Sequence, residues 1–479
     1  MRAMAAAGDD PETWRPDLSA HEGPKFRALA GALREAARSG VLAPGTRLPP
    51  MRDLAWRLGV TTGTVARAYQ AAAAEGVIES HVGRGSFIAP PRPRQPALQP
   101  LLYEAADGAG APGIADLRVP RLPDCGQAAV IGRHMAALAG ALEADILDYT
   151  PLSRDLRCRS AVLGWMGRRD FGPLAEPDLV LTHGGQHAIT LVMSLTLGAQ
   201  PAPVMVEALT YPGMRHAAQL MRTEAVPVAL DGQGMRPDDL DRVARASGAR
   251  LVCLTPSAQN PTLAAMDAAR RAEIVAVARR HDLQILEDEC YAPPPDAAAP
   301  PSLRALAPER VWHVASLSKI IAAGLRFGML LSPEGMGKAG RIAAQHSLMG
   351  LSQPVTGLVT RLLDSGDAAA IAADVQTKVE ARLTLARAAL APLEPAWQTG
   401  VPILWLPLPA PWPARDFAAR AALSGVVVRP ASEFLAAPGE PAPEAVRIAL
   451  DCRMPEAQLE ASLRLLAQLA LGPPPKASG

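Results

Sequence analysis

Short apolar segments alternate with longer segments of helical periodicity through most of the chain. The apolar segments lie at residues 178–182, 203–207, 251–255, 283–288, 311–315 and 328–332. Helical patterns lie between most of them, for example at 267–281. Continuous apolar strands that alternate with helices are typical of an α/β fold with a mainly parallel sheet covered on both faces. From about residue 341 the pattern is helical, and strands return at 402–408 and 425–430, which predicts a second, smaller α/β part.

The N-terminal part of the chain follows a different pattern. Apolar residues at helical spacing predict a helix at 26–40 and a shorter one at 51–59. A further helix begins after a glycine turn, with Thr61 or Thr62 as its N-cap. Two short helices joined in this way form a helix-turn-helix pattern, although a generic three-helix scaffold would show a similar one. Residues 77–89 then predict two strands around a Gly-Arg-Gly tip, the arrangement of a wing.

Composition separates these patterns into domains. Residues 1–20 predict a flexible N-terminus, and residues 21–89 predict a helical domain with a wing. Residues 90–113, which include most of APPRPRQPALQP, predict a proline-rich, semi-rigid linker. The α/β domain is expected at 114–473, with a large part at about 150–340 and a small part at about 341–473.

The distribution of charge points to the N-terminal domain. The chain has 479 residues and a net charge of +1, which argues against a polybasic coat over the whole molecule. Between His21 and Arg94, however, 11 Lys and Arg stand against 5 Asp and Glu, which favours a polyanionic partner for this domain. The five cysteines are scattered without a C-x-x-C pair, and the pattern predicts neither a signal peptide nor a membrane span. We therefore expect a cytoplasmic protein with reduced thiols.

Lys319 is the first candidate for chemistry, because it follows an apolar strand within the segment SLSKIIAAGLRFG. A lysine beside a buried sheet is costly unless it is paired, solvated or used chemically. A solvated loop lysine is the simplest interpretation, and the alternative is the amine of a Schiff base with pyridoxal phosphate. The phosphate of this cofactor needs backbone N–H groups at a helix start and a cation. Candidates for these roles are Gly184, Gly185, Gln186, Ser316, Ser318 and Arg326.

The ring of such a cofactor needs further partners. Its pyridine nitrogen requires a carboxylate, and Asp288 ends a predicted strand, where parallel sheets place their ligands. Tyr291 and Asn260 could hydrogen-bond the phenolic oxygen, and Tyr211 could stack on the ring. Each also has an ordinary explanation as a loop cap, a core tyrosine or a common turn. Their occurrence together in one order is what favours the cofactor.

The segment PGTRLPPMRDLAWRLGVTTGTVARAYQAAAAEGVIESHVGRGSFIA resembles the winged helix-turn-helix of GntR-type bacterial transcription regulators. This resemblance implies double-stranded DNA as a partner. Two positions depart from the family, which often has Ser and Arg where this chain has Pro50 and Thr62, so base readout stays open. The residues that the resemblance places against DNA are Arg52, Thr61, Thr62, Thr64 and Arg67, with Gly83 and Arg84 in the wing.

The chain from 115 to 470 resembles fold-type I pyridoxal-phosphate aminotransferases, with the anchors given above in the family's order. The resemblance implies catalytic roles for Lys319, Asp288 and Tyr211. It also implies that Arg447, in AVRIAL, clamps a substrate carboxylate together with Asn260.

Other implications of this resemblance are less direct. Tyr149, in LDYTP, matches a tyrosine that reaches the phosphate site of a neighbouring subunit, which implies a homodimer. The glycine-rich segment that usually follows it is missing, and the family's NPTG is NPTL here, with Leu263. His183 and His187 have the spacing of a zinc pair, but no glutamate lies between them and a phosphate loop explains the segment. We therefore expect no metal.

A GntR-like winged helix joined by a proline-rich linker to an aminotransferase-like domain is the arrangement of MocR-type regulators. The resemblance implies a bacterial transcription regulator in which an amino compound displaces Lys319 from pyridoxal phosphate and so alters the dimer and its DNA heads. Two alternatives stay open. One is a working aminotransferase with an appended regulatory domain, since Lys319, Asp288 and Arg447 are all present. The other is a binding module that does not use the cofactor.

Overall fold

The computed structural model describes residues 14–16, 18, 24–39, 41–74, 77–81, 85–89, 114–141, 144–149, 151, 153–167, 169–197, 202–291, 299–437 and 439–474. The chain divides into two units, Met1–Leu98 and Gln99–Gly479, and the boundary falls within the linker predicted at 90–113. The linker itself lies outside the described residues. None of the helices in the described ranges has the length and apolar character needed to cross a bilayer.

The N-terminal unit contains the expected helix-turn-helix and strand pair. Its elements are α1 (Lys25–Ser39), α2 (Met51–Leu58), α3 (Thr62–Ala74), β1 (Ile78–His81) and β2 (Gly85–Ile88). Gly59 ends α2 in the left-handed conformation, with φ 60°, and so turns the chain toward α3. Leu29, Leu54 and Val65 are fully buried and join the three helices in one core. β1 and β2 pair in antiparallel fashion, so the helical and strand predictions for this unit are confirmed.

Seven strands form the large sheet of the C-terminal unit, in the order β4-β12-β11-β10-β9-β5-β6. β12 is antiparallel to both of its neighbours, and the other pairs are parallel, which confirms a mainly parallel sheet. The sequence pattern missed only β6, an edge strand that is largely half-buried and contains Pro227. The strands are β4 (Leu179–Thr182), β5 (Val204–Glu207), β6 (Ala225–Val228), β9 (Leu251–Leu254), β10 (Gln284–Asp288), β11 (Val311–Ser316) and β12 (Gly328–Leu331).

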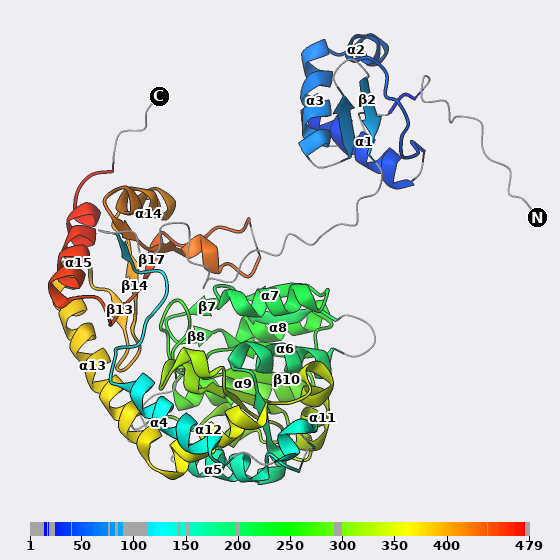
Figure 1. Cartoon of the computed structure of the whole chain (residues 1–479). Coiled ribbons are helices and arrows are strands. Elements are labelled where there is room, and N and C mark those ends of the chain that lie inside the picture. The colour runs from blue at the N-terminus through cyan, green and yellow to red at the C-terminus, as the bar shows by residue number, and fades with distance from the viewer. Residues whose placement is uncertain are drawn as a thin grey trace, which may run out of the picture. The chain divides into compact units, whose positions relative to one another are not determined.

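Helices cover both faces of this sheet (Figure 1). Val206 and Cys253 face α6 (Gly185–Thr196), α7 (Pro212–Leu220) and α11 (Gly337–Leu348). Met205 and Val252 face α8 (Pro237–Ser247), α9 (Ala268–Arg280) and α10 (Leu303–Leu306). Successive residues of a strand point to opposite faces, so a sheet buried on both sides needs apolar residues throughout each strand. This is the pattern seen in the sequence.

The smaller part of the unit is built on an antiparallel sheet in the order β13-β14-β17-β16. These strands are β13 (Ala396–Trp397), β14 (Ile403–Pro407), β17 (Ala445–Ala449) and β16 (Arg429–Pro430). The sheet shares a core with α13 (Asp367–Leu390), α14 (Ala414–Leu423) and α15 (Glu456–Leu471). Figure 1 shows α13 running from this part toward α12 (Gln353–Asp364).

The segment before residue 127 also contributes to the smaller part. β3 (Ala115–Asp116) pairs in parallel with β15 (Val426–Val427).

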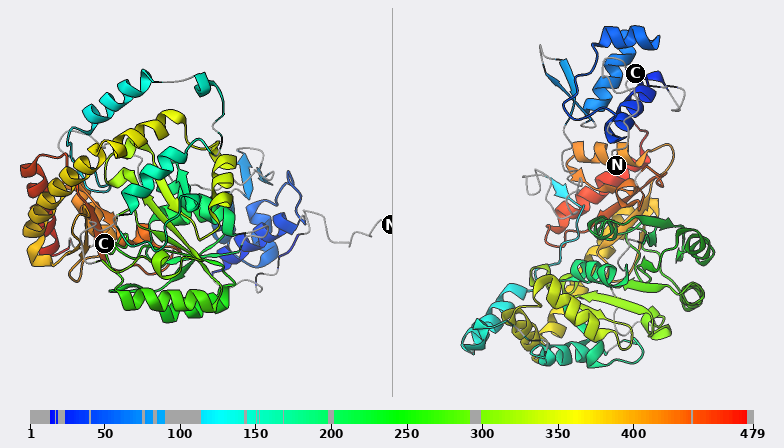
Figure 2. Two further views of the ribbon diagram at one scale, coloured as in Figure 1. Left: turned by 90° about the horizontal axis from the view of Figure 1, so that it is seen from below. Right: turned by 90° about the vertical axis from the view of Figure 1, so that its right-hand side faces the viewer.

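The large part also contains a short antiparallel hairpin, formed by β7 (Leu230–Asp231) and β8 (Gly234–Met235). Two further helices, α4 (Gln127–Ala139) and α5 (Leu156–Met166), contact α12. Figure 2 shows α4 at the outside of the unit, and α4 has no buried residue.

Candidate functional site

The carboxyl ends of the parallel strands carry the predicted functional residues. Gly184 follows β4, Asn260 follows β9, Asp288 ends β10 and Lys319 follows β11. Because β12 is antiparallel to both β4 and β11, those two strands run in the same direction as β9 and β10. Their carboxyl ends therefore meet at one edge of the sheet, the usual place for a ligand in such folds. A cavity of about 520 Å³ opens at this edge.

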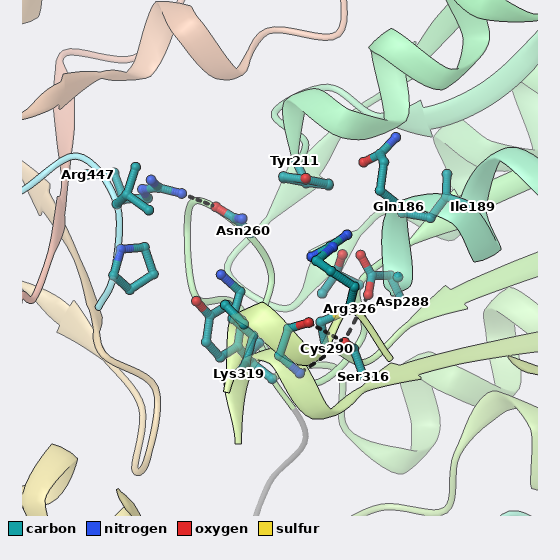
Figure 3. A pocket seen from close by; sticks show the side chains of 18 residues that line it. Gln186, Ile189, Tyr211, Asn260, Asp288, Cys290, Ser316, Lys319, Arg326 and Arg447 are labelled. Carbon is teal, nitrogen blue, oxygen red and sulfur yellow. Dashed lines mark hydrogen bonds between the residues drawn. The ribbon is translucent and has the colours of Figure 1, made fainter. Parts of the chain in front are cut away.

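The cavity brings together residues that are far apart in the sequence (Figure 3). Figure 3 shows Lys319 pointing into the cavity, with Arg447 and Asn260 toward one end and Gln186 and Asp288 toward the other. Most of the predicted cofactor and substrate residues line it: Gly185, Gln186, Tyr211, Asn260, Asp288, Tyr291, Ser316, Ser318, Lys319, Arg326 and Arg447. The lining residues that the sequence did not indicate are Val119, Pro120, Ile189, Thr255, Ala258, Cys290 and Ala323.

Gly184 and Arg326 form the expected phosphate end. Gly184 is the N-cap of α6 and has φ 82°, a conformation that favours glycine. A Cβ atom at Gly184 would lie 2.8 Å from Arg326 Nη2, so the glycine also admits the guanidinium. Arg326 Nη2 in turn donates to the carbonyl oxygen of His183 at 3.3 Å. A helix N-terminus and an arginine therefore converge, which is a suitable arrangement for an anion.

Ser316 and Ser318 lie next to this end, and Ser316 holds the turn that contains Ser318. The Oγ atom of Ser316 accepts a hydrogen bond from the Ser318 amide at 3.1 Å and donates to the Phe327 carbonyl oxygen at 3.0 Å. Ser316 thus fixes the short 3₁₀ turn Leu317–Lys319 at the end of β11. This turn directs the half-buried Lys319 into the cavity, with its Nζ atom 5.7 Å from the centre of the Tyr291 ring.

Asp288 is a buried carboxyl, 6% exposed, at the end of β10. Burial raises the pKa of Asp288, and hydrogen bonds from Cys290 offset this rise only in part. The backbone amide of Cys290 donates to Asp288 Oδ1 at 3.1 Å. Burial and the neighbouring Asp288 also raise the pKa of the Cys290 thiol, so this cysteine is protonated at neutral pH. A cation placed against Asp288 would favour its ionised form.

Tyr211 and Gln186 lie close together above the cavity. A Cβ atom on Gly213 would come within 2.1 Å of the Tyr211 ring and 2.2 Å of Gln186 Oε1, so a larger residue at this position would displace one or both side chains. Gln186 Nε2 donates to the Gly213 carbonyl oxygen at 2.9 Å. Its other atom, Oε1, is buried and accepts no hydrogen bond from the described residues.

Arg447 defines the opposite end of the cavity. It lies on β17, is 3% exposed, and its guanidinium is 4.7 Å from the centre of the Phe434 ring. Arg447 Nη1 donates to Asn260 Oδ1 at 2.9 Å, and Nη2 donates to the carbonyl oxygen of Arg118 at 2.6 Å. The predicted pair of Arg447 and Asn260 is therefore in direct contact.

A buried network holds the Asn260 turn, and sequence reasoning did not find it. Gln259, which is fully buried, donates to Glu207 Oε2 at 3.1 Å and to the Leu209 carbonyl oxygen at 2.6 Å. Its Oε1 atom accepts from the Thr262 amide and hydroxyl at 2.9 and 2.6 Å. Burial raises the pKa of Glu207 to about 8. The only sequence signals were polar residues beside the NPT turn and at the end of an apolar strand.

The N-terminal unit exposes most of its predicted DNA residues. Arg52, Thr62 and Arg67 are exposed. Thr61 is the N-cap of α3, because its Oγ1 atom accepts from the Thr64 amide at 3.2 Å; the two threonine hydroxyl oxygens are 2.9 Å apart. Gly83 and Arg84, the predicted wing tip, lie outside the described residues.

Two further predicted features lie apart from the cavity lining. Tyr149 is 81% exposed. His183 and His187 contact one another, since His187 Nδ1 accepts from the His183 amide at 3.1 Å. Their Nε2 atoms bond Gly350 and Ser347, respectively. No group of three or more metal-ligating side chains occurs in the ranges that the structure describes.

Two family matches cover these units. Residues 131–466 match aminotransferase class I and II, and residues 26–88 match the gntR family of bacterial regulatory proteins. The chain belongs to the aminotransferase class I and II family and carries a gntR-family domain in its N-terminal unit, the arrangement of MocR-type regulators. Because this aminotransferase family is dependent on pyridoxal phosphate, that cofactor is expected in the MocR-type regulator.

Relatives that are named as HTH-type or regulatory proteins support this assignment. The regulator is 26% identical over 471 residues to YdeF of Bacillus subtilis, an uncharacterized HTH-type transcriptional regulator, with 96% of this chain and 97% of YdeF covered. It is 28% identical over 341 residues to PdxR of Corynebacterium glutamicum, an HTH-type pyridoxine biosynthesis transcriptional regulator, with 70% and 71% covered. It is 26% identical over 334 residues to MocR of Rhizobium meliloti, a probable rhizopine catabolism regulatory protein, with 65% and 66% covered.

Solved aminotransferase structures share the fold of the C-terminal unit. Kynurenine aminotransferase of Pyrococcus horikoshii superposes with a TM-score of 0.66 at 22% identity, covering 75% of this regulator and 91% of that chain. LysN, an α-aminoadipate aminotransferase of Thermus thermophilus, gives 0.64 at 23% identity, covering 75% and 92%. At this identity the likeness shows the fold alone.

Proposed function

We propose that this MocR-type regulator binds pyridoxal phosphate in the cavity through Lys319 and there senses an amino compound. The observation that carries the proposal is the convergence of Lys319, Asp288 and Arg326 on one cavity of about 520 Å³. A solvated loop lysine would not require a buried carboxyl and an arginine beside it. When bound, the cofactor supplies an aldehyde that condenses with primary amines and a ring that withdraws electrons.

The residues of the cavity fit this cofactor. Gly184, Gly185, Ser318 and Arg326 would hold the phosphate, and Tyr211 would cover the ring. The raised pKa of Asp288 indicates that its carboxylate lacks sufficient compensation from the protein, and a protonated pyridine nitrogen would provide it.

The other end of the cavity supports recognition of the effector. Arg447, held by Asn260, would bind the effector's carboxylate and orient its amine toward the Lys319 side of the cavity. The effector would shift the regulator between two states only if it binds one of them more tightly. This shift would regulate transcription if the two states also differ in their affinity for DNA.

The N-terminal unit would bind the operator. Arg52 and Arg67, with the hydroxyl groups of Thr61, Thr62 and Thr64, would contact phosphates, which position a protein on DNA without specifying sequence. We place this activity in the bacterial cytoplasm.

A homodimer is part of the same proposal. Met135, Leu147 and Tyr149 are exposed large side chains on and after α4, and α4 has no buried residue. A second copy would cover this apolar surface and would receive Tyr149 near its own phosphate end.

A spectroscopic experiment tests the cofactor proposal. The full chain loaded with pyridoxal phosphate should show a visible absorption band that Lys319→Ala abolishes, whereas Lys338→Ala, which removes an exposed lysine of α11, should retain it. A colourless wild type, or an unchanged band in Lys319→Ala, contradicts the proposal.

A transamination assay with a panel of amino and keto acids tests the alternative of a working aminotransferase. Rapid turnover, without protection of DNA upstream of its own or a neighbouring gene, would identify such an enzyme.

A further inference from the structure

The described lining of the cavity leaves one cation for the effector. Its charged side chains are Asp288, Lys319, Arg326 and Arg447. The proposed function assigns the first three to the cofactor, and the present inference rests on that assignment. Arg447 is then the remaining cation among the described lining residues.

Arg447 is fixed before any effector binds. Its guanidinium donates to two neutral oxygen atoms, Asn260 Oδ1 at 2.9 Å and the Arg118 carbonyl oxygen at 2.6 Å. Its guanidinium also lies 4.7 Å from the centre of the fully buried Phe434 ring. A rigid, largely desolvated guanidinium is well suited to one carboxylate, which it can bind with two parallel hydrogen bonds.

The neighbouring arginines are already bound to acids of this chain. Arg118 donates to both oxygens of Asp116 at 2.8 Å, and Arg121 lies 3.7 Å from Asp451. Arg429, opposite Arg447 in the sheet register, binds Glu433. None of these three arginines lines the cavity. A second acidic group on an effector would therefore find its nearest cations engaged.

Aliphatic residues line part of the cavity close to Arg447. Val119 and Pro120 follow directly on Arg118, whose carbonyl group bonds Arg447, and Ala258 lies two residues before Asn260. Ala323 lines the same cavity. A second charged group against these side chains would lose its hydration without gaining a partner, which is costly for either sign of charge.

From these contacts we propose that the effector is an amino acid with a single carboxylate and an uncharged aliphatic remainder. The same chemistry could place the amine next to the carboxylate or at the far end of the aliphatic chain. The proposal excludes dicarboxylic amino acids, diamino acids and simple amines as preferred effectors.

A matched series of amines tests this selectivity on the full chain loaded with pyridoxal phosphate. Norvaline and its isomer 5-aminopentanoate carry one carboxylate, glutamate adds a second carboxylate to norvaline, ornithine adds a second amine, and n-butylamine lacks the carboxylate. The half-saturation concentration is read from the change in the visible band, and independently from the amine concentration that changes DNA affinity. We expect the better of the two isomers to bind about tenfold or more tightly than the other three compounds.

Two variants sharpen the test. Arg447→Leu should lower the affinity for the preferred isomer to the level of n-butylamine. The affinity for n-butylamine itself should change less than about twofold. Val119→Arg should strengthen the binding of glutamate relative to that of norvaline, because it adds a cation to the aliphatic wall. This comparison is made on variant protein that retains its cofactor band.

The outcomes separate this inference from the proposed function. A normal cofactor band with glutamate, ornithine or n-butylamine as the tightest ligand overturns the inference and leaves Lys319 chemistry intact. Absence of a band that depends on Lys319 overturns the proposed function and, with it, the inference. A band that no amine in the series changes also overturns both.

Discussion

Arg447 in the cavity and Arg67 on α3 are both proposed to meet an anion, yet their surroundings are opposite. Arg447 is buried and held by Asn260 and a backbone carbonyl, whereas Arg67 is exposed on its helix. The cavity thus holds its charged groups in place before a ligand arrives. The proposed DNA surface would instead rely on exposed side chains whose positions the phosphates would fix on binding. We therefore expect mutations in the cavity to have large, ligand-specific effects, and mutations on α3 to have small effects that depend on salt.

The largest effect should follow from Asp288→Ala. Removing a buried carboxyl that we propose to face the cofactor ring should weaken pyridoxal phosphate binding about a hundredfold, equivalent to about 2.7 kcal/mol. Titration of the apo-protein with the cofactor, followed by the visible band, measures this change. Asp416→Ala removes an exposed carboxylate from α14 of the same unit and should have no effect. Equal affinities in wild type and Asp288→Ala would refute the role of Asp288 at the pyridine nitrogen.

Gln259→Leu should have the next largest effect on ligand binding. The leucine cannot hold the Asn260 turn through Thr262 and Leu209, so Arg447 should lose its fixed position. We expect norvaline to bind about tenfold more weakly, with n-butylamine nearly unchanged, because only norvaline carries a carboxylate. Equal weakening of both amines would show that Gln259 supports the cavity in general and has no specific effect on Arg447.

The buried Glu207 should make stability depend on pH. Its pKa is raised from 4.5 to about 8, so between these values the folded state keeps a proton that the unfolded state has released. Stability should therefore fall as pH rises through this window. Glu207→Gln cannot ionise, so it should not lose stability in this way. As pH rises, the unfolding free energy of the variant minus that of wild type should grow by roughly 1 kcal/mol per pH unit.

Thermal unfolding of wild type and Glu207→Gln at pH 5 and pH 8 measures this difference. The two proteins should be closest at pH 5, and the variant should unfold at the higher temperature at pH 8. A constant difference at both pH values would mean that Glu207 is not protonated in the folded state.

The smallest effect should come from Arg67→Ala. Loss of one phosphate contact should weaken DNA binding a few-fold at low salt and reduce the slope of log affinity against log salt by about 1. The cofactor band should stay unchanged. Arg157→Ala removes an exposed arginine from the C-terminal unit and should leave the salt slope as it is. Equal slopes for wild type and Arg67→Ala would place α3 away from the DNA.

Much of the cavity was predictable because its residues carry distinctive chemistry at strand ends. Lys319, Asp288 and Arg326 could be assigned from the types of residue that the cofactor needs, and the structure places them around one cavity. The parallel sheet was also predictable, since strands buried on both faces must be apolar throughout. On the DNA surface, the fold of the helices was predictable, but their contacts depend on a partner that the chain does not contain.

The rest of the cavity depends on long-range contacts that local pattern does not encode. Arg447 bonds the carbonyl group of Arg118, 329 positions earlier, and this contact brings the aliphatic wall of Val119 to the site. Glu207 ends an apolar strand, and nothing local indicates that Gln259 will cover it. Leu263 stands where related aminotransferases have glycine, and it does adopt a left-handed conformation, with φ 63°. Its side chain is buried against Val401 and Ile403, a compensation that the motif alone could not predict.

The central claim is that chemistry at Lys319 controls the DNA-binding unit. The most direct test measures the affinity of the full chain, loaded with pyridoxal phosphate, for a duplex from the region upstream of its own gene. The amine that responds most strongly in the spectroscopic series is titrated against wild type and Lys319→Ala. We predict that this amine changes the DNA affinity of wild type at least about fivefold and leaves Lys319→Ala unchanged. The same response in both proteins, or an unchanged affinity in wild type while its cofactor band shifts, would contradict the account.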